Sequence, residues 1–379
     1  MTRVLLAHPG SELYGSDRMA VATVSSLADL GIEVCAIVPQ HGALIERLEG
    51  AGARVVELDL PVLRKSQLRP AALLRLVAGM PLTLARAAAA IRRARADVVY
   101  VNTITQPWWI LAARLVGARV IVHVREAESD VPDLMKRALL LPLALADVIP
   151  CNSRATEEYV LRYSAGTAGR TAVLYNGKDW SEYTSAAPAR FEAPVRLTLV
   201  GRLSPRKGTD TAVEALAILR KRGYDVRLAL VGDVFPGYEW FADQLRSRAL
   251  ALGLSDSIDF AGFTDDPAAA FANSDIALVP SRVEPFGTVA AEAMASARCT
   301  VVARTQGLVE IVDGPEVGST FDPGDAAGLA DACASLIDSP QRAAAIALAG
   351  RELIVERFSS AGYAQGTAVL VRKAMEGRR

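Results

Sequence analysis

The sequence predicts an α/β protein built from two doubly wound parallel-sheet domains. Short apolar, β-branched runs alternate with stretches rich in Ala, Leu and Arg along the whole chain, which is typical of repeated βαβ units. At 379 residues the chain is longer than a single hydrophobic core usually holds. Residues 185–194 carry two prolines among small residues without hydrophobic periodicity, so this segment is the expected linker between the domains.

Composition and charge narrow the possible functions. Hydrophobic residues make up 51% of the chain, and basic and acidic residues are equal at 42 each, so nothing favours nucleic acid as a partner. The four scattered cysteines are expected to be buried free thiols of a reducing compartment, and no histidine spacing indicates a metal site. We detect no signal peptide and no apolar run of membrane-spanning length, so a cytoplasmic protein is expected.

The first half of the chain predicts a series of strands separated by helical patterns. In such a parallel sheet, functional groups are expected at the carboxyl ends of the strands. The predicted strands are residues 4–8, 33–38, 54–58, 98–102, 119–124 and 148–151.

A glycine-containing loop follows the first of these strands. Gly10 and Gly15 permit an irregular backbone there, and Ser16 or Asp17 is expected to cap a helix that runs to Gly31.

A basic stretch free of acidic residues follows the third strand. No Asp or Glu lies between Asp59 and Asp97, and leucines and alanines separate the basic residues. Such a stretch forms either a solvated helix face or a surface that lies on an anionic bilayer. Our hypothesis is peripheral docking on the inner face of a membrane through residues 64–95. The basic residues are Arg64, Lys65, Arg69, Arg75, Arg86, Arg92, Arg93 and Arg95.

Polar residues appear abruptly after the strands at 98–102 and 119–124. His123 near the end of the later strand either joins a site or satisfies a backbone carbonyl. Trp108 and Trp109 either stack on an acceptor sugar or pack under the following helix.

The second half opens with a strand at 195–200 and a basic turn before a helix at 210–221. Arg202 and Lys207 place two cations in this turn, where they can stabilise the negative charge of a departing diphosphate. A basic surface turn is the alternative. The turn matches neither a Walker A loop nor a dinucleotide-binding fingerprint.

The stretch at 281–298 gives the most specific signal. An apolar run at 276–279 predicts a buried strand, and helix-favouring residues begin at Thr288. The N–H groups of the first helical turn favour a phosphate, while Glu284 and Glu292 on either side can accept hydrogen bonds from hydroxyl groups. A ligand with central phosphate and flanking hydroxyls is a nucleotide sugar. The N–H groups belong to Gly287, Thr288 and Val289.

These motifs resemble those of a known family. Glu284 and Glu292, eight positions apart in E-P-F-G-T-V-A-A-E, resemble the E-x7-E signature of retaining glycosyltransferase family 4. G-R-L-S-P-R-K-G at 201–208 is similar to the diphosphate clamp of that family. The resemblance spans nearly the whole chain and implies the GT-B fold, in which two Rossmann-like, doubly wound parallel-sheet domains face each other across a cleft.

The resemblance also implies a division of labour along the chain. Residues 1–187 form the expected acceptor-side domain and residues 194–357 the nucleotide-sugar domain, with a last helix at 358–379 returning to the first domain. The implied reaction moves a hexose, with retention, from a UDP- or GDP-sugar to a glycan or lipid-linked acceptor, without metal or other cofactor. The implied setting is bacterial polysaccharide, glycolipid or glycoconjugate synthesis. A non-catalytic sugar-nucleotide-binding subunit, or a phosphorylase or epimerase on the same fold, stays open as an alternative.

The resemblance carries roles to matching positions. Glu292 is expected to bind the ribose, and His123 is expected to approach the donor sugar. In the loop at 306–307 the family commonly has two glycines, and Gln306 replaces one of them. Arg202, Lys207, Glu284 and His123 are the catalytic candidates. The donor-binding candidates are Glu292, Gly287, Thr288, Val289, Gly15, Gly262 and Phe263.

Overall fold

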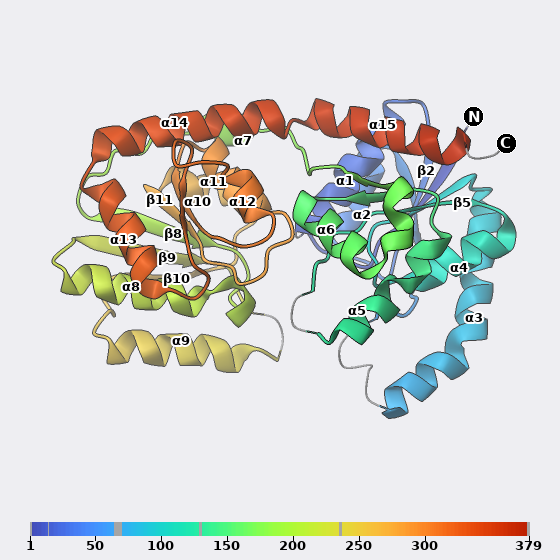
Figure 1. Ribbon diagram of the computed structural model, residues 1–379, viewed down its shortest axis with the longest axis horizontal. Helices are drawn as coiled ribbons and strands as arrows, with labels where there is room; N and C mark the ends of the chain where they lie inside the picture. The colour runs from blue at the N-terminus through green and yellow to red at the C-terminus, as the bar shows by residue number, and fades with distance from the viewer. Residues whose placement is uncertain (1, 14, 64–69, 129–130, 235–236, 377–379) are drawn as a thin grey trace. The chain divides into compact units, whose positions relative to one another are not determined.

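The computed structural model describes residues 2–13, 15–63, 70–128, 131–234 and 237–376, without the side chains of 70–74 and 77. The chain forms two compact units (Figure 1). The first comprises Met1–Lys178 together with Ser360–Arg379, and the second comprises Asp179–Ser359.

The first unit is built on a parallel sheet with the order β3-β2-β1-β4-β5. The predicted strands are confirmed, except that the run at 148–151 pairs mainly with β7 in a separate ladder. Single bridges from Ile121 to Val148 and from Val124 to Cys151 join that ladder to β5. The strands are β1 (Arg3–Ala7), β2 (Glu33–Val38), β3 (Ala53–Glu57), β4 (Val98–Val101), β5 (Arg119–Val122), β6 (Ile149–Cys151) and β7 (Thr171–Val173).

Alternate residues of each strand enter two cores, one on each face of this sheet. Leu5 of β1 lies in the core that includes the tryptophans of α4, whereas Val4 and Leu6 lie in the core with α1 and α15. The helical segments are α1 (Gly15–Ala28), α2 (Leu44–Gly50), α3 (Pro70–Ala94), α4 (Pro107–Val116), α5 (Asp133–Leu140), η2 (Leu141–Leu145), α6 (Arg154–Tyr163), η3 (Ala165–Arg170) and α15 (Ser360–Glu376).

The second unit is built on a parallel sheet with the order β10-β9-β8-β11-β12-β13. Its strands are β8 (Val195–Val200), β9 (Val226–Val231), β10 (Ile258–Gly262), β11 (Ile276–Val279), β12 (Cys299–Ala303) and β13 (Ser319–Phe321). Its helical segments are α7 (Ser181–Thr184), η4 (Pro205–Lys207), α8 (Thr209–Lys221), α9 (Glu239–Ala251), α10 (Pro267–Ala272), α11 (Thr288–Ala295), α12 (Leu308–Ile311), α13 (Ala326–Ile337) and α14 (Pro340–Arg357).

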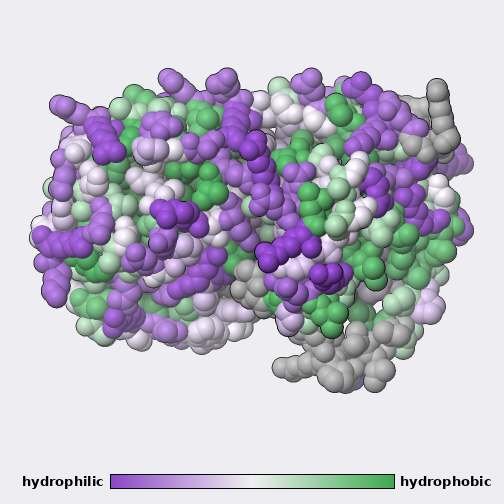
Figure 2. Space-filling model, viewed as in Figure 1, coloured by the Kyte–Doolittle hydropathy of each residue, from purple (hydrophilic) through white to green (hydrophobic). Residues whose placement is uncertain are grey.

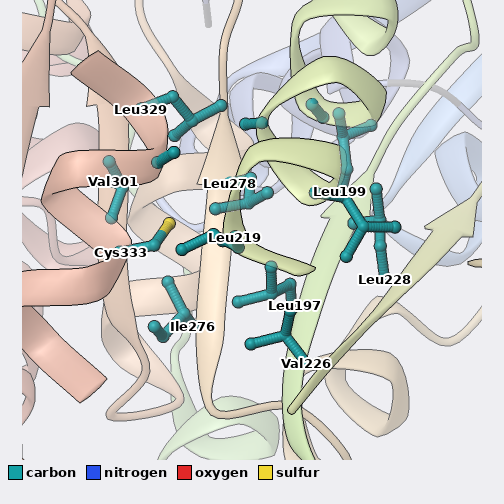
Figure 3. Packing of buried hydrophobic residues seen from close by; sticks show 14 of the residues in the cluster. Leu197, Leu199, Leu219, Val226, Leu228, Ile276, Leu278, Val301, Leu329 and Cys333 are labelled. Atoms are coloured by element: carbon teal, nitrogen blue, oxygen red, sulfur yellow. The ribbon is translucent and has the colours of Figure 1, made fainter. Parts of the chain in front are cut away.

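One core of the second unit joins its central strands to α8 and α13 (Figure 3). Leu197 of β8, Leu278 of β11 and Leu219 of α8 pack in this core, and Cys333 of α13 lies in the same cluster. Burial raises the pKa of the Cys333 thiol to about 12, so it behaves as a small apolar side chain. This packing fixes the strands whose carboxyl ends carry the candidate site.

The expected linker at 185–194 belongs instead to the second unit, and the chain crosses between units at Lys178 and again at Ser359. Buried Arg298 donates hydrogen bonds to the carbonyls of Ser274 and Ala187, and Arg351 donates to the carbonyl of Ala186. Small residues and prolines keep the segment at 185–194 out of a regular helix or strand. The carbonyls of Ala186 and Ala187 therefore lack a partner in secondary structure, and arginines far along the chain can bind them.

Helix α15 packs on the first unit. Tyr363 of α15 is buried, and its hydroxyl lies 2.7 Å from the Oγ1 of Thr23 in α1. Phe358, at the start of the predicted last helix, belongs instead to the second unit, where its ring lies edge-on against Phe286 with centroids 5.5 Å apart.

None of the described helices combines the length and the apolar character that a membrane span requires.

An ion pair fastens the start of β8 to the start of β11. Asp275 is 1% exposed and accepts hydrogen bonds from the backbone N–H of Arg196 at 2.9 Å, from its Nε at 3.0 Å and from its Nη2 at 2.9 Å. Burial acts to raise the pKa of Asp275, but the hydrogen bonds and charge of Arg196 outweigh it and leave this pKa below its usual range. The pair therefore stabilises the fold above the unfolded pKa of the carboxyl, and this stabilisation is lost as the pH falls through the lower folded pKa.

Replacing Asp275 by Ala should lower the free energy of unfolding of the second unit by about 2 kcal/mol, because the Arg196 N–H loses its acceptor. Chemical denaturation at neutral pH measures the loss. Asp256→Ala, at an exposed position in the same unit, is the matched control and should leave stability unchanged. Equal losses in the two variants would contradict this role.

Candidate active site

Each of the two sheets has a topological switch point, which is where doubly wound folds bind their ligands. In the first sheet the chain runs outward from β1 through β2 to β3 and then returns to the other side of β1 as β4. In the second it runs outward from β8 to β10 and returns as β11. Loops leaving the carboxyl ends of such a central strand pair diverge and leave a crevice between them.

Lys207 and Glu284 meet at the switch point of the second sheet. Lys207 ends the short turn η4 after β8, and Glu284 lies in the loop after β11. The Nζ of Lys207 lies 2.5 Å from the Oε2 of Glu284, and the Ser281 hydroxyl donates to the same oxygen at 3.4 Å. The two side chains are 28% and 14% exposed, so their mutual attraction is only partly screened by water.

A second ion pair holds these two loops in place. The guanidinium of Arg282, after β11, binds both carboxylate oxygens of Asp210 at the start of α8, at 2.9 and 2.7 Å. The Arg282 N–H donates to the carbonyl of Arg206 at 2.8 Å. Gly208 allows this approach, because a Cβ there would lie 2.0 Å from the carbonyl oxygen of Pro280. The position of Lys207 is therefore set by backbone contacts as well as by charge.

Helix α11 begins at Thr288, as the sequence predicted, and presents its first turn beside Glu284. Gly287 before it adopts a φ of 109°, which strongly favours glycine. The side chain of Gln306 accepts from the N–H of Glu284 at 2.9 Å, and the N–H of Gly307 donates to the Glu284 carbonyl at 3.1 Å. The loop that carries Glu284 is thus fastened to the loop after β12.

The other candidates of this unit lie at the same carboxyl edge of the sheet. Arg202 follows β8 and is half-buried, while Glu292 is buried in α11. The carbonyl of Gly262, at the end of β10, accepts from the N–H of Gly232 after β9 at 2.7 Å. Phe263 is 62% exposed, so this residue is accessible to a ligand.

His123 is fully buried in the first unit. Its Nδ1 lies 2.7 Å from the hydroxyl of Tyr100 and 3.1 Å from Nη2 of Arg125. A guanidinium can only donate, so Nδ1 is an acceptor and the ring hydrogen sits on Nε2. Burial, followed by the charge of Arg125, lowers the pKa of His123 well below its ordinary value, so the imidazole is neutral. Within the described part of the chain, Nε2 has no hydrogen-bond partner.

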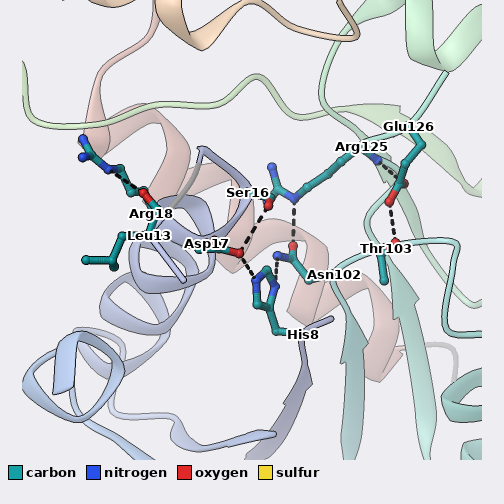
Figure 4. A network of polar contacts seen from close by, with 9 residues as sticks. All are labelled: His8, Leu13, Ser16, Asp17, Arg18, Asn102, Thr103, Arg125 and Glu126. Carbon is teal, nitrogen blue, oxygen red and sulfur yellow. Dashed lines mark hydrogen bonds and ion pairs between the residues drawn. The ribbon is translucent and has the colours of Figure 1, made fainter. Parts of the chain in front are cut away.

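A directed chain of hydrogen bonds occupies the switch point of the first sheet (Figure 4). The Nε of Arg125 donates to Oδ1 of Asn102 at 2.8 Å, so the amide nitrogen of Asn102 faces Nδ1 of His8 at 2.9 Å. Nδ1 of His8 is therefore an acceptor, and its Nε2 donates to Oδ1 of Asp17 at 2.6 Å. Sequence reasoning missed the pairing of His8 with Asp17.

Arg125 is the hub of this network. It also donates to Oδ1 of Asn176 at 2.7 Å and to the hydroxyl of Tyr363 on α15 at 3.2 Å. The neighbouring Glu126 accepts from the hydroxyl of Thr103 and from the N–H of Arg125 at 3.1 Å. Burial raises the pKa of Glu126. The polar residues that end β4 and β5 were the signal for this cluster.

Of the two alternatives for Trp108 and Trp109, the structure supports packing. Both belong to α4 and are buried in the core, and the indole N–H of Trp108 donates to the carbonyl of Pro61 at 2.6 Å.

The expected cap of the first helix needs correction. Helix α1 begins at Gly15, which places Ser16 and Asp17 inside its first turn and not at the cap. The side chain of Asp17 binds His8 because that buried ring requires an acceptor.

Replacing Gly287 by Ala should destabilise the second unit by about 2 kcal/mol, because the new Cβ meets an unfavourable φ and a side-chain carbon of Leu308 at 2.7 Å. Denaturation midpoints of purified variants measure the effect. The control is Gly50→Ala in α2, where an added Cβ meets no atom within 4 Å. Stability of Gly287→Ala equal to or above that of the unchanged protein would contradict the role of this backbone conformation.

Comparison with known proteins agrees with this architecture. Residues 184–353 match the family described as glycosyl transferases group 1, and residues 15–177 match the glycosyl transferase 4-like domain. A glycogen synthase of Mycobacterium tuberculosis is 32% identical over 61% of this chain, which spans 55% of that relative's length. A lipopolysaccharide core biosynthesis glycosyltransferase of Rhizobium meliloti is 28% identical over 91% of this chain and 92% of its own.

Two solved structures share the fold. HepE of Anabaena, crystallised in complex with UDP-glucose, superposes with a TM-score of 0.84 at 22% identity, covering 98% of this chain and 100% of that one. Sucrose-phosphate synthase from Thermosynechococcus elongatus gives a TM-score of 0.81 at 20% identity over the whole of both chains. With these two Rossmann-like units, the chain belongs to glycosyltransferase family 4 and has the GT-B fold.

Proposed function

We propose that this protein is a retaining, metal-independent glycosyltransferase. It moves a hexose from a UDP- or GDP-sugar to a hydroxyl of a glycan or lipid-linked acceptor, in bacterial polysaccharide, glycolipid or glycoconjugate synthesis. The observation that carries the proposal is the pairing of Lys207 with Glu284 at a switch point, beside the first turn of α11. The names of the relatives, which include transferases of lipopolysaccharide and phosphatidylinositol mannosides, support the same class of reaction.

The Lys207–Glu284 pair acts as a preorganised donor site. Before substrate binds, the carboxylate of Glu284 holds the ammonium of Lys207 in one place. A diphosphate attracts Lys207 more strongly, and Glu284 is then free to accept a hydrogen bond from a hydroxyl of the donor sugar. One ligand with phosphate and sugar hydroxyls therefore satisfies both groups.

During sugar transfer, negative charge develops on the leaving diphosphate, close to the proposed positions of the Lys207 and Arg202 side chains. The bond from the sugar C1 to the β-phosphate oxygen breaks, and its electron pair goes to the phosphate. The acceptor oxygen forms the new bond to C1 on the same face, and its proton goes to the departing phosphate. Lys207 and Arg202 stabilise the leaving diphosphate together with the N–H groups of Gly287, Thr288 and Val289, which makes a metal unnecessary.

The remaining candidates bind the rest of the donor. Glu292 accepts hydrogen bonds from the ribose, and the backbone of Gly262 and Phe263 contacts the base. In the first unit, the neutral His123 offers its Nε2–H, which lacks a partner in the described residues, to a hydroxyl of the donor sugar. Gly15 begins α1 and leaves room for the diphosphate at the start of that helix.

The first unit also supports peripheral docking at the cytoplasmic face of a membrane, near a lipid-linked acceptor. Of the basic stretch, Arg64, Lys65 and Arg69 lie outside the described residues, whereas Arg86 and Arg92 are exposed on α3. Hydrophobic residues gather on the right of Figure 2, where Figure 1 places α3, α4 and α5. Exposed leucines on α3, α4, α5 and η2, together with the exposed arginines of α3, give a composition suited to an anionic bilayer. The leucines are Leu82, Leu115, Leu134 and Leu141.

Replacing Lys207 by Ala should lower turnover by about a hundredfold to a thousandfold, because the departing charge loses its cation. The assay measures release of nucleoside diphosphate from UDP-glucose or GDP-mannose by the purified protein. Lys221→Ala, an exposed lysine in the last turn of α8, is the control and should keep full activity. Near-normal turnover of Lys207→Ala would rule out this assignment, and no turnover by the unchanged protein with any donor would favour a non-catalytic subunit.

Vesicles that contain phosphatidylglycerol should sediment with the protein at low salt, and added salt should release it, because the attraction is electrostatic. Vesicles of phosphatidylcholine alone are the control. Absence of salt-sensitive sedimentation would remove membrane docking from the proposal without affecting sugar transfer.

A further inference from the structure

A groove of about 550 Å³ lies on the first unit between α3 and the strands β2 and β3, of which β3 forms the edge of the sheet. It is built entirely from this unit and from elements that carry none of the candidate catalytic residues. Its volume is in the range of pockets that hold small ligands. The lining residues include Ile37, Val56, Leu58, Ala89, Ala90, Arg54, Arg86 and Arg93.

The groove exists because α3 presents very small side chains to the edge of the sheet. Ala85, Ala89, Ala90 and Ala94 lie on one helical face, at spacings of four, one and four residues, and a methyl group is too short to reach the strands. Ile37 of β2 is the register partner of Val56 in β3, so both side chains form the floor on that face. The floor is apolar and continuous with the core of this unit, so it favours an apolar ligand.

Three arginines surround this apolar floor. Arg86 and Arg93 are seven residues apart and therefore lie on the same face of α3 as the alanines. Arg54 of β3 enters from the opposite side, where its Nη2 contacts the sulfur of Cys35 at 3.5 Å. Among the described residues, none of these three arginines has a carboxylate ion-pair partner within 4.0 Å.

The charge of the rim is positive overall. The acid that lines the groove, Glu57, has its Oε1 3.4 Å from Nδ1 of His41 outside it. Arg86 and Arg93 of α3 and Arg54 of β3 are exposed to water, and all three line one hollow with an apolar floor. Guanidinium groups prefer phosphate or carboxylate oxygens, while the floor requires a hydrocarbon.

We propose that this groove binds one anionic lipid molecule, with its phosphate headgroup among Arg54, Arg86 and Arg93 and an acyl chain between the floor of Ile37 and Val56 and the alanines of α3. The site is separate from sugar transfer and does not depend on it. It also differs from general attraction to a charged bilayer, because it requires a hollow of defined shape and only those arginines that line it.

Monomeric dodecyl phosphate, below its micelle concentration and without vesicles, is the probe for this site. Isothermal titration calorimetry should show saturable binding of one molecule per chain. Inorganic phosphate and uncharged dodecyl maltoside should bind far more weakly. Inorganic phosphate has no hydrocarbon chain for the apolar floor, and dodecyl maltoside has no phosphate for the arginines. Equal binding of inorganic phosphate would show a simple anion site and would overturn the proposal.

Matched variants separate the groove from the general charge of α3. Arg93→Ala should weaken dodecyl phosphate binding by about tenfold, whereas Arg92→Ala, exposed on the same helix outside the groove, should not change it. Ala89→Phe should fill the groove and abolish binding, whereas Ala78→Phe, exposed elsewhere on α3, should not. If Ala89→Phe has a lowered melting temperature, the double variant with Arg86→Ala and Arg93→Ala is used in its place, and loss of dodecyl phosphate binding in it is the expected result. Equal losses in the Arg92 and Arg93 variants, or unchanged binding in Ala89→Phe, would overturn the proposal.

Discussion

The ion pair between Lys207 and Glu284 is the contact on which the proposed donor site depends. These residues are 77 positions apart, and only the adjacency of β8 and β11 brings their loops together. Arg282 clamps both loops through Asp210 and the Arg206 carbonyl, so the pair is held by a rigid surround. When a diphosphate arrives, the Lys207–Glu284 pair opens while the backbone that carries both residues stays in place, and a site preorganised in this way accelerates the breaking of a bond.

In the first unit, buried polar side chains are held in place by hydrogen bonds to one another. Arg125 supplies hydrogen atoms to both His123 and Asn102, and this donation fixes the tautomer of His123 and, through Asn102, that of His8. Because Arg125 also binds Tyr363, the last helix of the chain takes part in setting these tautomers. The arrangement is a network in which each member depends on its neighbours, so its strength is cooperative.

Local sequence signals predicted much of the fold. The apolar run at 276–279 and the helix-favouring residues from Thr288 are confirmed as β11 and α11, because strand and helix formation there depend on near neighbours. The contacts of Arg125 depend on the order of strands in the sheet and could not be read from spacing. His8 and Asp17 are only nine positions apart, but their contact depends on the path of the loop between β1 and α1. The segment at 185–194 misled for a similar reason, since Arg298 is 111 positions from the carbonyl of Ala187 that it binds.

A crystal structure of the protein with UDP or GDP bound tests the central claim most directly. We predict the Nζ of Lys207 within hydrogen-bonding distance of a phosphate oxygen, the first-turn N–H groups of α11 directed at the same diphosphate, and the Lys207–Glu284 pair opened. A diphosphate bound elsewhere on the second unit, with the pair of Lys207 and Glu284 intact as it is in the free protein, would contradict the account.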